Sequence, residues 1–394
     1  MDSLTRGIDT LIAIAIVATL APFLAAAVPG KRVPQVVILI IGGIIIGPQV
    51  LGLAETASVE LFANVGLGFV FLFAGYELDP LLFRARYGRN AVLAWVIAAV
   101  LALAVVGILE AAGLVHAFVP VSIALTTTGL GTLLPILRDN DMLSGEFGKY
   151  IVAAGATGEF LPIVAVAIFL GTTSSVAAIV SLLMIGGLAA VFALAPRLIH
   201  STTITRILIA GEHATSQTTL RLTVLLLLVL LGFAARFGLD IVLGAFIAGL
   251  VLRRWAPGHV HSLEEKLDAV GYGFFIPIFF VSSGMALDID SIAAAPLRLL
   301  AFFLLLLVIR GLPALLVYRR TLNTTQRRQM VFITATTLPM LVALAHIGLA
   351  NGTMLPENAA ALVGAGVLSV LVFPAVAVAI GSHTRPQPAP AKPG

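Results

Sequence analysis

The stretch Ala124-Leu-Thr-Thr-Thr-Gly-Leu-Gly-Thr-Leu-Leu-Pro135 stands in the middle of an apolar run that is long enough to cross a bilayer. Three consecutive threonines beside two glycines and a proline are a poor sequence for a continuous helix in lipid. Glycine and proline weaken the helix, and threonine hydroxyls replace the lost backbone hydrogen bonds. We therefore predict an interrupted helix here, with Thr126, Gly129 and Gly131 in its unwound part.

A second stretch, Thr334-Ala-Thr-Thr-Leu-Pro339, has a similar pattern late in the chain and predicts a second interrupted helix. Thr334, Thr336, Thr337 and Pro339 are its helix-breaking residues. Two interrupted helices at matching positions are typical of inverted-repeat transporters, which bind ions between half-helices near the bilayer midplane. The alternative is that these residues only let neighbouring helices pack closely, since Thr, Gly and Pro are common in membrane helices. The matching positions favour the transporter.

The whole chain has the composition of an integral membrane protein. Of its 394 residues, 60% are hydrophobic and 11% are charged, which leaves too little polar surface for a water-soluble globule. We predict an all-α polytopic membrane protein with an inverted repeat and two crossed discontinuous helices. The expected spans number about 13: 10–28, 34–53, 59–78, 91–113, 115–137, 150–170, 174–195, 221–237, 239–255, 266–289, 293–319, 328–350 and 357–380.

These spans predict a single integral membrane domain over 1–394. Residues 1–195 form the first repeat plus a linker helix, and 221–380 form the second repeat. The Pro- and Ala-rich stretch 381–394 is expected to be a disordered cytoplasmic tail, with no nucleotide-binding regulatory domain after the last span. The first apolar stretch is interpreted as a retained helix, because no small-residue cleavage site is obvious after Val28.

Lysine and arginine predict the topology, because loops on the cytoplasmic side hold positive charge. The loops after the odd-numbered spans and the tail hold 19 of the 23 basic residues. We therefore expect the N-terminus outside, the C-terminus in the cytoplasm, and a multi-pass protein of the cell membrane. This distribution also explains the basic pI without nucleic acid as a partner.

The chain lacks the residues and motifs that several classes of enzyme and metal-binding protein require. The chain has no cysteine, and none of its seven histidines stands in a metal-ligand spacing. We find no nucleophile elbow, P-loop or dinucleotide fingerprint. The sequence therefore predicts a protein that is not an enzyme and needs no cofactor.

Two charges lie at mid-membrane depth, Glu159 in the span 150–170 and Arg310 in the span 293–319. A charge at this depth is costly and needs a partner or a hydrated cavity. One interpretation is a structural Glu–Arg pair. We favour a site where a proton and a cation compete for Glu159, with Arg310 as the charge-compensating group. In this interpretation Glu159 binds the transported metal cation. Its candidate neighbouring ligands are Thr157, Thr127 and Thr128.

Other charged residues have structural interpretations. Glu77, Asp79, Asp288 and Asp290 lie at predicted helix ends, where we expect capping or loop order. His346 is interpreted as a packed histidine.

At this point the chain resembles the monovalent cation:proton antiporter superfamily, in particular its bacterial branch of sodium/proton antiporters and potassium-efflux systems. Four motifs carry the resemblance in this order: Gly42-Gly-Ile-Ile-Ile-Gly-Pro48, Leu72-Phe-Ala-Gly-Tyr-Glu-Leu-Asp79, Leu243-Gly-Ala-Phe-Ile-Ala-Gly249 and Phe279-Phe-Val-Ser-Ser-Gly-Met285.

The resemblance implies exchange of Na⁺ or K⁺ for H⁺ by an elevator-like motion, a homodimer in the lipid bilayer, and ion-binding and basic residues at the positions of Glu159 and Arg310. The usual acid is Asp after a second Asp, an Asn or a Gln, whereas this chain has Gly158-Glu159. The missing second acid favours electroneutral exchange. The alternatives are a sodium-coupled symporter of a small organic solute and a transport-inactive membrane sensor.

Overall fold

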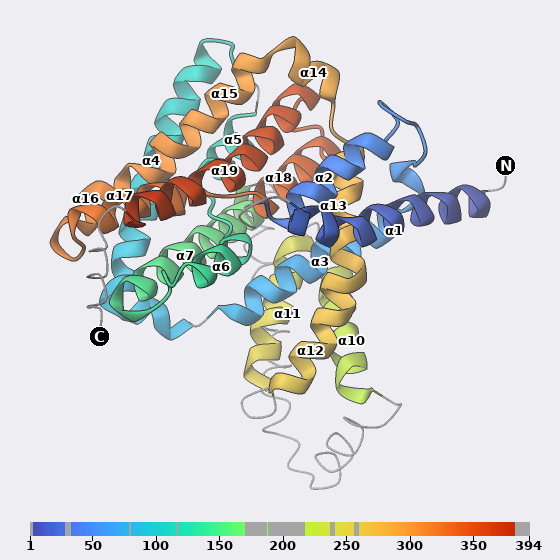
Figure 1. The fold of residues 1–394 in the computed structure, drawn as a ribbon, viewed down its shortest axis with the longest axis horizontal. Helices are drawn as coiled ribbons and strands as arrows, with labels where there is room; N and C mark the ends of the chain where they lie inside the picture. Colours follow the sequence, from blue (N-terminus) through green and yellow to red (C-terminus); the bar gives the residue numbers. More distant parts are fainter. Residues whose placement is uncertain are drawn as a thin grey trace, which may run out of the picture.

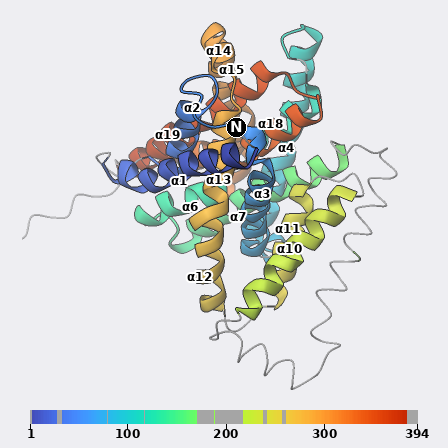
Figure 2. The same cartoon turned by 90° about the vertical axis from the view of Figure 1, so that its right-hand side faces the viewer.

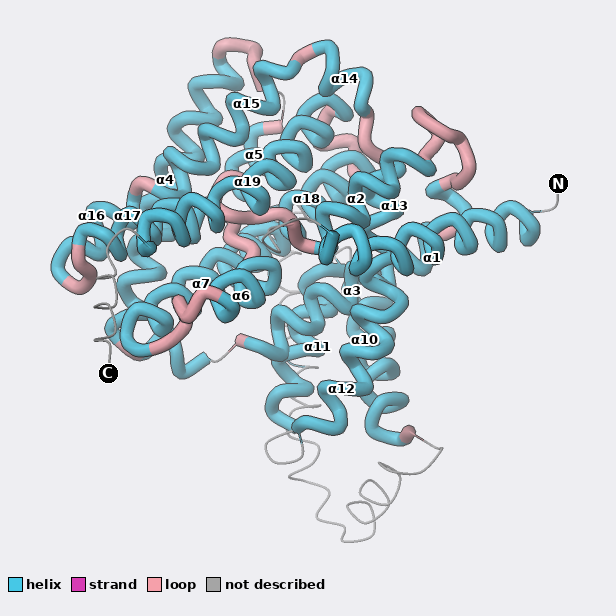
Figure 3. Tube along the Cα trace, in the orientation of Figure 1, coloured by secondary structure: helices cyan, strands magenta, loops and turns pink. Residues whose placement is uncertain are grey.

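A computed structural model of the chain describes residues 3–27, 33–78, 80–115, 117–169, 187, 217–236, 241–255 and 260–382. These residues form helices and loops, as Figure 3 shows for the described part. The predicted span 174–195 lies outside the described residues, apart from residue 187. The tail 383–394 also lies outside them.

The first half of the described chain contains the following helices: α1 (Ser3–Ala27), α2 (Gln35–Ile46), α3 (Glu60–Glu77), α4 (Arg86–Ala111), α5 (Phe118–Ala124), α6 (Leu130–Asp139) and α7 (Gly145–Phe169). The second half contains α10 (Thr218–Arg236), α11 (Ile241–Trp255), α12 (Val260–Val270), α13 (Ile276–Met285), α14 (Ile289–Ala294), α15 (Pro296–Leu305), α16 (Pro313–Val317), α17 (Thr324–Ala335), α18 (Pro339–Ala350) and α19 (Pro356–Ser382). Two π-helical segments, η3 (Gly271–Phe275) and η4 (Leu306–Gly311), join α12 to α13 and α15 to α16.

The all-α membrane architecture is confirmed. Over the described ranges, nine helical stretches are long and apolar enough to cross a membrane. The predicted number of thirteen is not confirmed. α2 differs from its prediction most clearly, because it ends at Ile46 instead of continuing to residue 53. The chain turns at Gly47 and passes through Gly52, whose φ of 63° suits a residue without a Cβ.

Both predicted interruptions are present, but Gly131 lies in α6 and Thr334 in α17, so neither is part of an unwound segment. Residues 125–129 separate α5 from α6, and residues 336–338 separate α17 from α18. Pro339 begins α18 at its first turn, where a proline's fixed φ and missing N–H do not weaken the helix. Figure 3 shows loop segments between helical tubes at the centre of the molecule.

The helices pack into two groups. The α3 group contains α1, α2, α3, α10, α11, α12 and α13, and the α7 group contains α4 to α7 and α14 to α19. In Figure 1 the α3 group occupies the right and lower part and the α7 group the left and upper part. Figure 2 shows α10 beside α11 in the α3 group. The most extensive contacts between the groups are those of α7 with α3 and α11.

Glycines hold the α3 group together at two similar crossings. At the contact of α3 with α11, a Cβ on Gly75 would overlap the carbonyl oxygen of Phe246. At the contact of α2 with α13, a Cβ on Gly43 would overlap the carbonyl oxygen of Val281. Small residues let membrane helices approach this closely. The predicted repeat relates the second and third spans to the ninth and tenth, so it pairs these two crossings with each other.

Candidate functional site

The two interrupted helices meet at their unwound segments. The N–H of Gly129 donates to the carbonyl oxygen of Thr336 over 2.9 Å, and the hydroxyls of Thr127 and Thr337 are 2.8 Å apart. The hydroxyl of Thr128 donates to the carbonyl oxygen of Thr334 over 2.6 Å. Backbone groups that a continuous helix would satisfy therefore find partners across the crossing, as a buried interruption requires.

Threonine hydroxyls also satisfy the ends of the half-helices. Thr126 and Thr127 each donate to a carbonyl oxygen three residues earlier, over 2.7 Å. The hydroxyl of Thr336 donates to the carbonyl oxygen of Phe332 over 2.9 Å. These bonds compensate for carbonyl groups that lose their helical donors where a helix stops.

Glu159 lies on α7 and faces the start of α6. The N–H of Leu130, the first residue of α6, donates to Oε1 of Glu159 over 2.9 Å. The backbone of Gly131 is a further hydrogen-bonding partner of this carboxyl group. The free N–H groups and the positive end of the helix dipole make this half-helix N-terminus a good place for an anion.

Arg310 lies in the π-helical segment η4 and is 1% exposed. Its Nε donates to the hydroxyl of Thr128 over 2.9 Å, and its Nη2 donates to the carbonyl oxygen of Ala154 over 3.0 Å. No guanidinium nitrogen of Arg310 lies within 4.0 Å of a carboxylate oxygen of Glu159, so the two side chains form no ion pair. The structural Glu–Arg pair considered as an alternative is therefore absent between these two described residues. Arg310 instead joins η4 to the helix crossing and to α7.

Gly158 is explained by the position of Arg310. An ideal Cβ on Gly158 would lie 2.5 Å from the Thr128 hydroxyl oxygen and 2.7 Å from Nη2 of Arg310. Both distances are shorter than a real Cβ contact, so a side chain here would displace one of these groups. The guanidinium group thus fills the space beside the residue that precedes Glu159.

A cavity of about 410 Å³ gives Glu159 access to the space between the two helix groups. The α7 group contributes Glu159, Gly131, Thr132 and Pro339, among others. The α3 group contributes residues from four segments: Val33, Pro34, Gln35, Val36, Leu39, Val70, Phe71, Phe73, Ala74, Glu77, Tyr272, Ile276, Pro277 and Phe280. Several of these lie at helix ends that adjoin the basic loops. The cavity therefore opens toward the side with most of the positive charge.

The predicted site residues fall into two sets. Glu159, Gly131 and Pro339 line the cavity. Three other predicted ligands, Thr127, Thr128 and Thr157, are buried, with their hydroxyls bonded inside the protein. Thr157 donates to the carbonyl oxygen of Ala153, one turn earlier in α7. Their role in binding an ion stays a prediction.

Sequence reasoning missed Glu77 and Thr132 as members of the site. Glu77 is the last residue of α3, as expected for a helix end, but it lines the same cavity as Glu159. Arg253 donates to the carbonyl oxygens of Tyr76 and Glu77 over 2.9 and 3.2 Å, which fixes this end of α3. The signal available in the sequence was Glu77 itself, an acid directly after an apolar span.

The expectation for Asp288 is confirmed. Its carboxylate accepts hydrogen bonds from the N–H and the hydroxyl of Ser291, over 3.0 and 2.6 Å, and it caps α14. These hydrogen bonds lower the pKa of Asp288, which lies outside the membrane spans.

Comparison with known proteins gives one family. The family model described as "Sodium/hydrogen exchanger, transmembrane" matches residues 12–380. The Bacillus subtilis protein YjbQ is 27% identical over 93% of this chain and 62% of its own length. The Na(+)/H(+)-K(+) antiporter GerN of Bacillus cereus is also 27% identical, over 66% of this chain and 67% of its own length. This chain therefore spans less than two thirds of the first of these relatives.

The structure of the sodium proton antiporter MjNhaP1 from Methanocaldococcus jannaschii has a similar fold. The two structures match with a TM-score of 0.66 over 97% of this chain and 98% of that chain, at 17% sequence identity. This similarity supports the fold prediction, including the crossed interrupted helices.

Proposed function

Since this chain belongs to the transmembrane sodium/hydrogen exchanger family, we propose that it exchanges Na⁺ or K⁺ for H⁺ across the cell membrane, with Glu159 as the residue that binds both ions in turn. One observation carries the proposal. The carboxylate of Glu159 meets the N-terminus of α6 inside a cavity that opens to one side, and it is not paired with Arg310.

Competition for one carboxylate is enough to couple the two ions. A cation that binds Glu159 must displace the proton, and a proton must displace the cation. If only the loaded carrier changes the side to which the site opens, each cation moved one way requires a proton moved the other way. Thr132 lines the same cavity as Glu159 and supplies a hydroxyl oxygen of the kind that hard cations prefer.

We propose that the exchange is electroneutral. The position before Glu159 is Gly158, and the guanidinium group of Arg310 occupies the adjoining space. An acid at position 158 would therefore have no room without rearrangement. One carboxylate can carry one proton or one monovalent cation, so the charge on the carrier is the same in both directions.

Arg310 acts in this proposal as a fixed positive group that holds the crossing together. It bonds Thr128 and Ala154 and does not exchange protons, because guanidinium stays protonated in proteins. The half-helix α6 provides the positive end that faces Glu159 when no cation is bound.

We further propose a homodimer with the N-terminus outside and the C-terminus in the cytoplasm. The basic loops support this orientation. α1 leaves large apolar side chains exposed on a single chain, including Ile12, Ile16 and Phe23. We assign this surface to lipid and to a second copy. Cross-linking of a cysteine placed at Ile16 in membranes would test the dimer, because the chain has no cysteine of its own.

The central experiment uses purified protein in vesicles that contain a pH-sensitive dye. Addition of Na⁺, K⁺ or Li⁺ should move protons in the unchanged protein and should fail to do so in Glu159→Gln. Glu146→Gln is the matched control, because Glu146 is an exposed acid in the first turn of the same helix. Unchanged exchange in Glu159→Gln would remove the site assignment.

The same assay addresses the alternatives. A sodium-coupled symporter would move Na⁺ only with its organic solute, and a membrane sensor would move no ion in any condition. Abolition of the membrane potential with an ionophore tests stoichiometry: an electroneutral exchanger keeps its rate, whereas an electrogenic one changes it.

A further inference from the structure

The Glu159 cavity is larger than an alkali cation needs. Its volume of about 410 Å³ gives room for about a dozen water molecules, at about 30 Å³ each. A small cation with one shell of water takes up about half of that space. Cavities of about 300–1,000 Å³ are typical of sites that bind organic molecules. The cavity can therefore hold a ligand several times larger than Na⁺ or K⁺.

The walls of this cavity are mainly apolar. Four aromatic side chains line it, Phe71, Phe73, Tyr272 and Phe280, and most of the other lining residues are aliphatic. Phe73 and Tyr272 are stacked, with ring centroids 5.0 Å apart and an angle of 11° between the ring planes. A hard cation prefers oxygen ligands and gains little from such walls. An organic cation can bury its apolar groups against them.

The charges of the cavity favour a positive ligand. The described residues that line it include two acids, Glu77 and Glu159, and no lysine, arginine or histidine. Arg310 is buried behind the site, where it bonds Thr128 and Ala154. An anion would therefore meet two carboxylates without a basic side chain to pair with. A cation with one positive charge can pair with Glu159.

Tyr272 presents its ring to the cavity from an unusual helical segment. It belongs to η3, the π-helical turn between α12 and α13. Such turns are rare and are frequent at functional sites. Gly271 lets the turn approach α3, because a Cβ at this position would lie 2.6 Å from the ring of Phe73. Phe73 is buried, whereas Tyr272 is 54% exposed, so much of the tyrosine ring remains available to a ligand.

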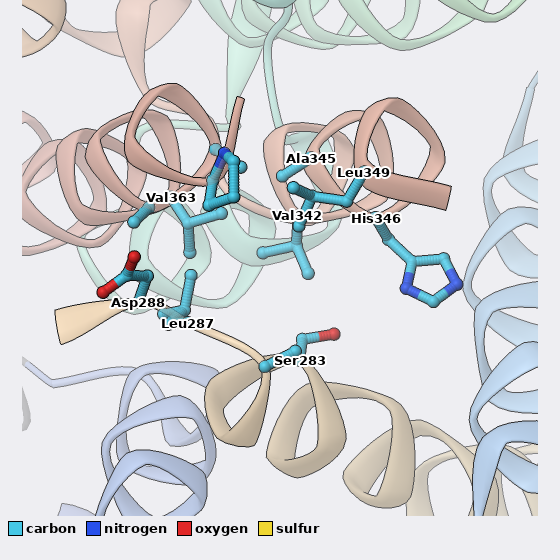
Figure 4. Close-up of a pocket in the computed structure, with 12 residues that line it drawn as sticks. Ser283, Leu287, Asp288, Val342, Ala345, His346, Leu349 and Val363 are labelled. Atoms are coloured by element: carbon cyan, nitrogen blue, oxygen red, sulfur yellow. The ribbon is translucent and has the colours of Figure 1, made fainter. Parts of the chain in front are cut away.

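Two smaller cavities do not fit an organic cation. The cavity between α13 and the later part of α18 has a volume of about 40 Å³, room for a few water molecules at most. Figure 4 shows Asp288 and His346 at its opposite ends, with apolar side chains such as Val342 between them. Another cavity that Glu159 lines measures about 20 Å³. The large cavity is the one of these three that can hold such a ligand.

We propose that this exchanger also carries organic monocations, of the class of quaternary ammonium ions with an apolar substituent, in exchange for protons. The inference rests on the proposed function, because it uses the same competition at Glu159. The positive nitrogen pairs with the carboxylate, and the substituent lies against the ring of Tyr272. Aromatic faces attract quaternary ammonium ions. Such an ion has no proton to release, so it takes the place of Na⁺ or K⁺ in the cycle, and the proton returns on Glu159.

Benzyltrimethylammonium is the probe, because its charge is permanent. It cannot lose a proton and cross the lipid as a neutral amine, which would change the internal pH without the protein. The ion is added outside vesicles that contain the purified protein and a pH-sensitive dye, and vesicles without protein measure leakage. We expect the ion to move protons in the unchanged protein and to move none in Glu159→Gln.

The aromatic wall is tested by a ratio, the half-maximal concentration of benzyltrimethylammonium divided by that of the alkali cation exchanged fastest. Tyr272→Leu should raise this ratio about five- to tenfold, the effect of losing one cation–π contact. Tyr272→Phe keeps the ring and should keep the ratio. Phe62→Leu is the matched control, because Phe62 lies on α3 like Phe73 but does not line the cavity. The ratio compares two ions in one protein, so a general loss of active protein cancels.

Two results would overturn the inference. Benzyltrimethylammonium that slows alkali-cation exchange without moving protons would be a blocker and not a transported ion. An equal ratio in Tyr272→Leu and the unchanged protein would exclude the aromatic wall as its binding surface.

The same measurements separate the inference from the proposed function. Exchange of alkali cations without any exchange of benzyltrimethylammonium would contradict the inference and leave the proposed function standing. Exchange of the organic ion alone would contradict the proposed function, because Na⁺ and K⁺ would not be carried, and would leave the inference standing.

Discussion

The N–H of Leu130 donates a hydrogen bond of 2.9 Å to Oε1 of Glu159, so the start of a half-helix, and not Arg310, faces this carboxylate. The contact joins the first interrupted helix to the next span. It also sets the position of the charge inside the cavity, because a helix N-terminus holds an anion in a defined direction.

Glu159→Asp should therefore slow the exchange without abolishing it. The shorter side chain keeps a titratable carboxylate but withdraws it from Leu130 by about one methylene. A hydrogen bond to a charged group contributes about 1.5–3 kcal/mol, so we expect the rate to fall about tenfold or more. Dye-loaded vesicles measure this rate, with Glu146→Asp as the control. A full rate in Glu159→Asp would mean that the Leu130 contact does not position the carboxylate.

Thr128→Val should weaken the helix crossing. Thr128 accepts from Nε of Arg310 and donates to the carbonyl oxygen of Thr334, and all three groups are buried. Valine has a similar shape but leaves the guanidinium with a missing partner, at a cost of about 1–3 kcal/mol. The midpoint of thermal unfolding in detergent should fall.

Thr128→Ser is the matched control, because it keeps the hydroxyl and loses only a methyl group. We expect its unfolding midpoint to lie close to that of the unchanged protein. Equal losses in the valine and serine variants would show that the methyl group, and not the hydrogen bonds, stabilises the crossing.

The sequence predicted the interrupted helices because their signal is local. Thr126 to Gly129 and Thr336 to Pro339 are adjacent in the chain, and their effect on a helix follows from residue type. The composition likewise predicted the membrane architecture. Glu159 stood out because few charges occur at mid-depth, and such a charge requires a particular environment.

The partners of these residues could not be predicted, because they depend on how distant helices cross. Nothing in the residue pattern indicates that Arg310 bonds Thr128 and Ala154 instead of Glu159. It showed Gly158, but not that Arg310 fills the space beside it. Glu77 was interpreted as a helix-end residue, which is correct locally, and only the packing of α3 against α7 shows that it shares a cavity with Glu159.

Gly75→Ala should destabilise the α3 group. The added Cβ would overlap the carbonyl oxygen of Phe246, which belongs to the backbone of α11 and cannot move aside alone. Overpacking of this kind costs about 1–3 kcal/mol. Gly232→Ala in α10 is the control, because nothing lies within 4 Å of its added Cβ. Gly75→Ala should lower the unfolding midpoint, and Gly232→Ala should leave it unchanged or raise it slightly; similar midpoints would argue against a tight crossing.

The cap of α14 should depend on pH. The pKa of Asp288 is lowered in the folded protein by its hydrogen bonds to Ser291, so its stabilising effect is complete above the unfolded value of about 3.9. It is lost as the pH falls through the lower folded value. Hydrogen exchange should show protection of the Ser291 N–H at neutral pH and weaker protection at pH about 3. Asp288→Ala should remove the difference, while Asp290→Ala should retain it.

Glu77→Gln should raise the cation concentration needed for half-maximal exchange. Glu77 and Glu159 line the same cavity, so a cation that enters is attracted by both carboxylates before it binds Glu159. Removal of the Glu77 charge weakens that attraction by about 1 kcal/mol for a partly buried site, which corresponds to roughly a fivefold change in apparent affinity for the cation. The maximal rate should change less, because Glu159 remains to carry the ion. Glu146→Gln removes an acid from the surface outside the cavity and should leave the half-maximal concentration unchanged. If Glu77→Gln lowers only the maximal rate, Glu77 takes part in the movement of the carrier instead of in the capture of cations.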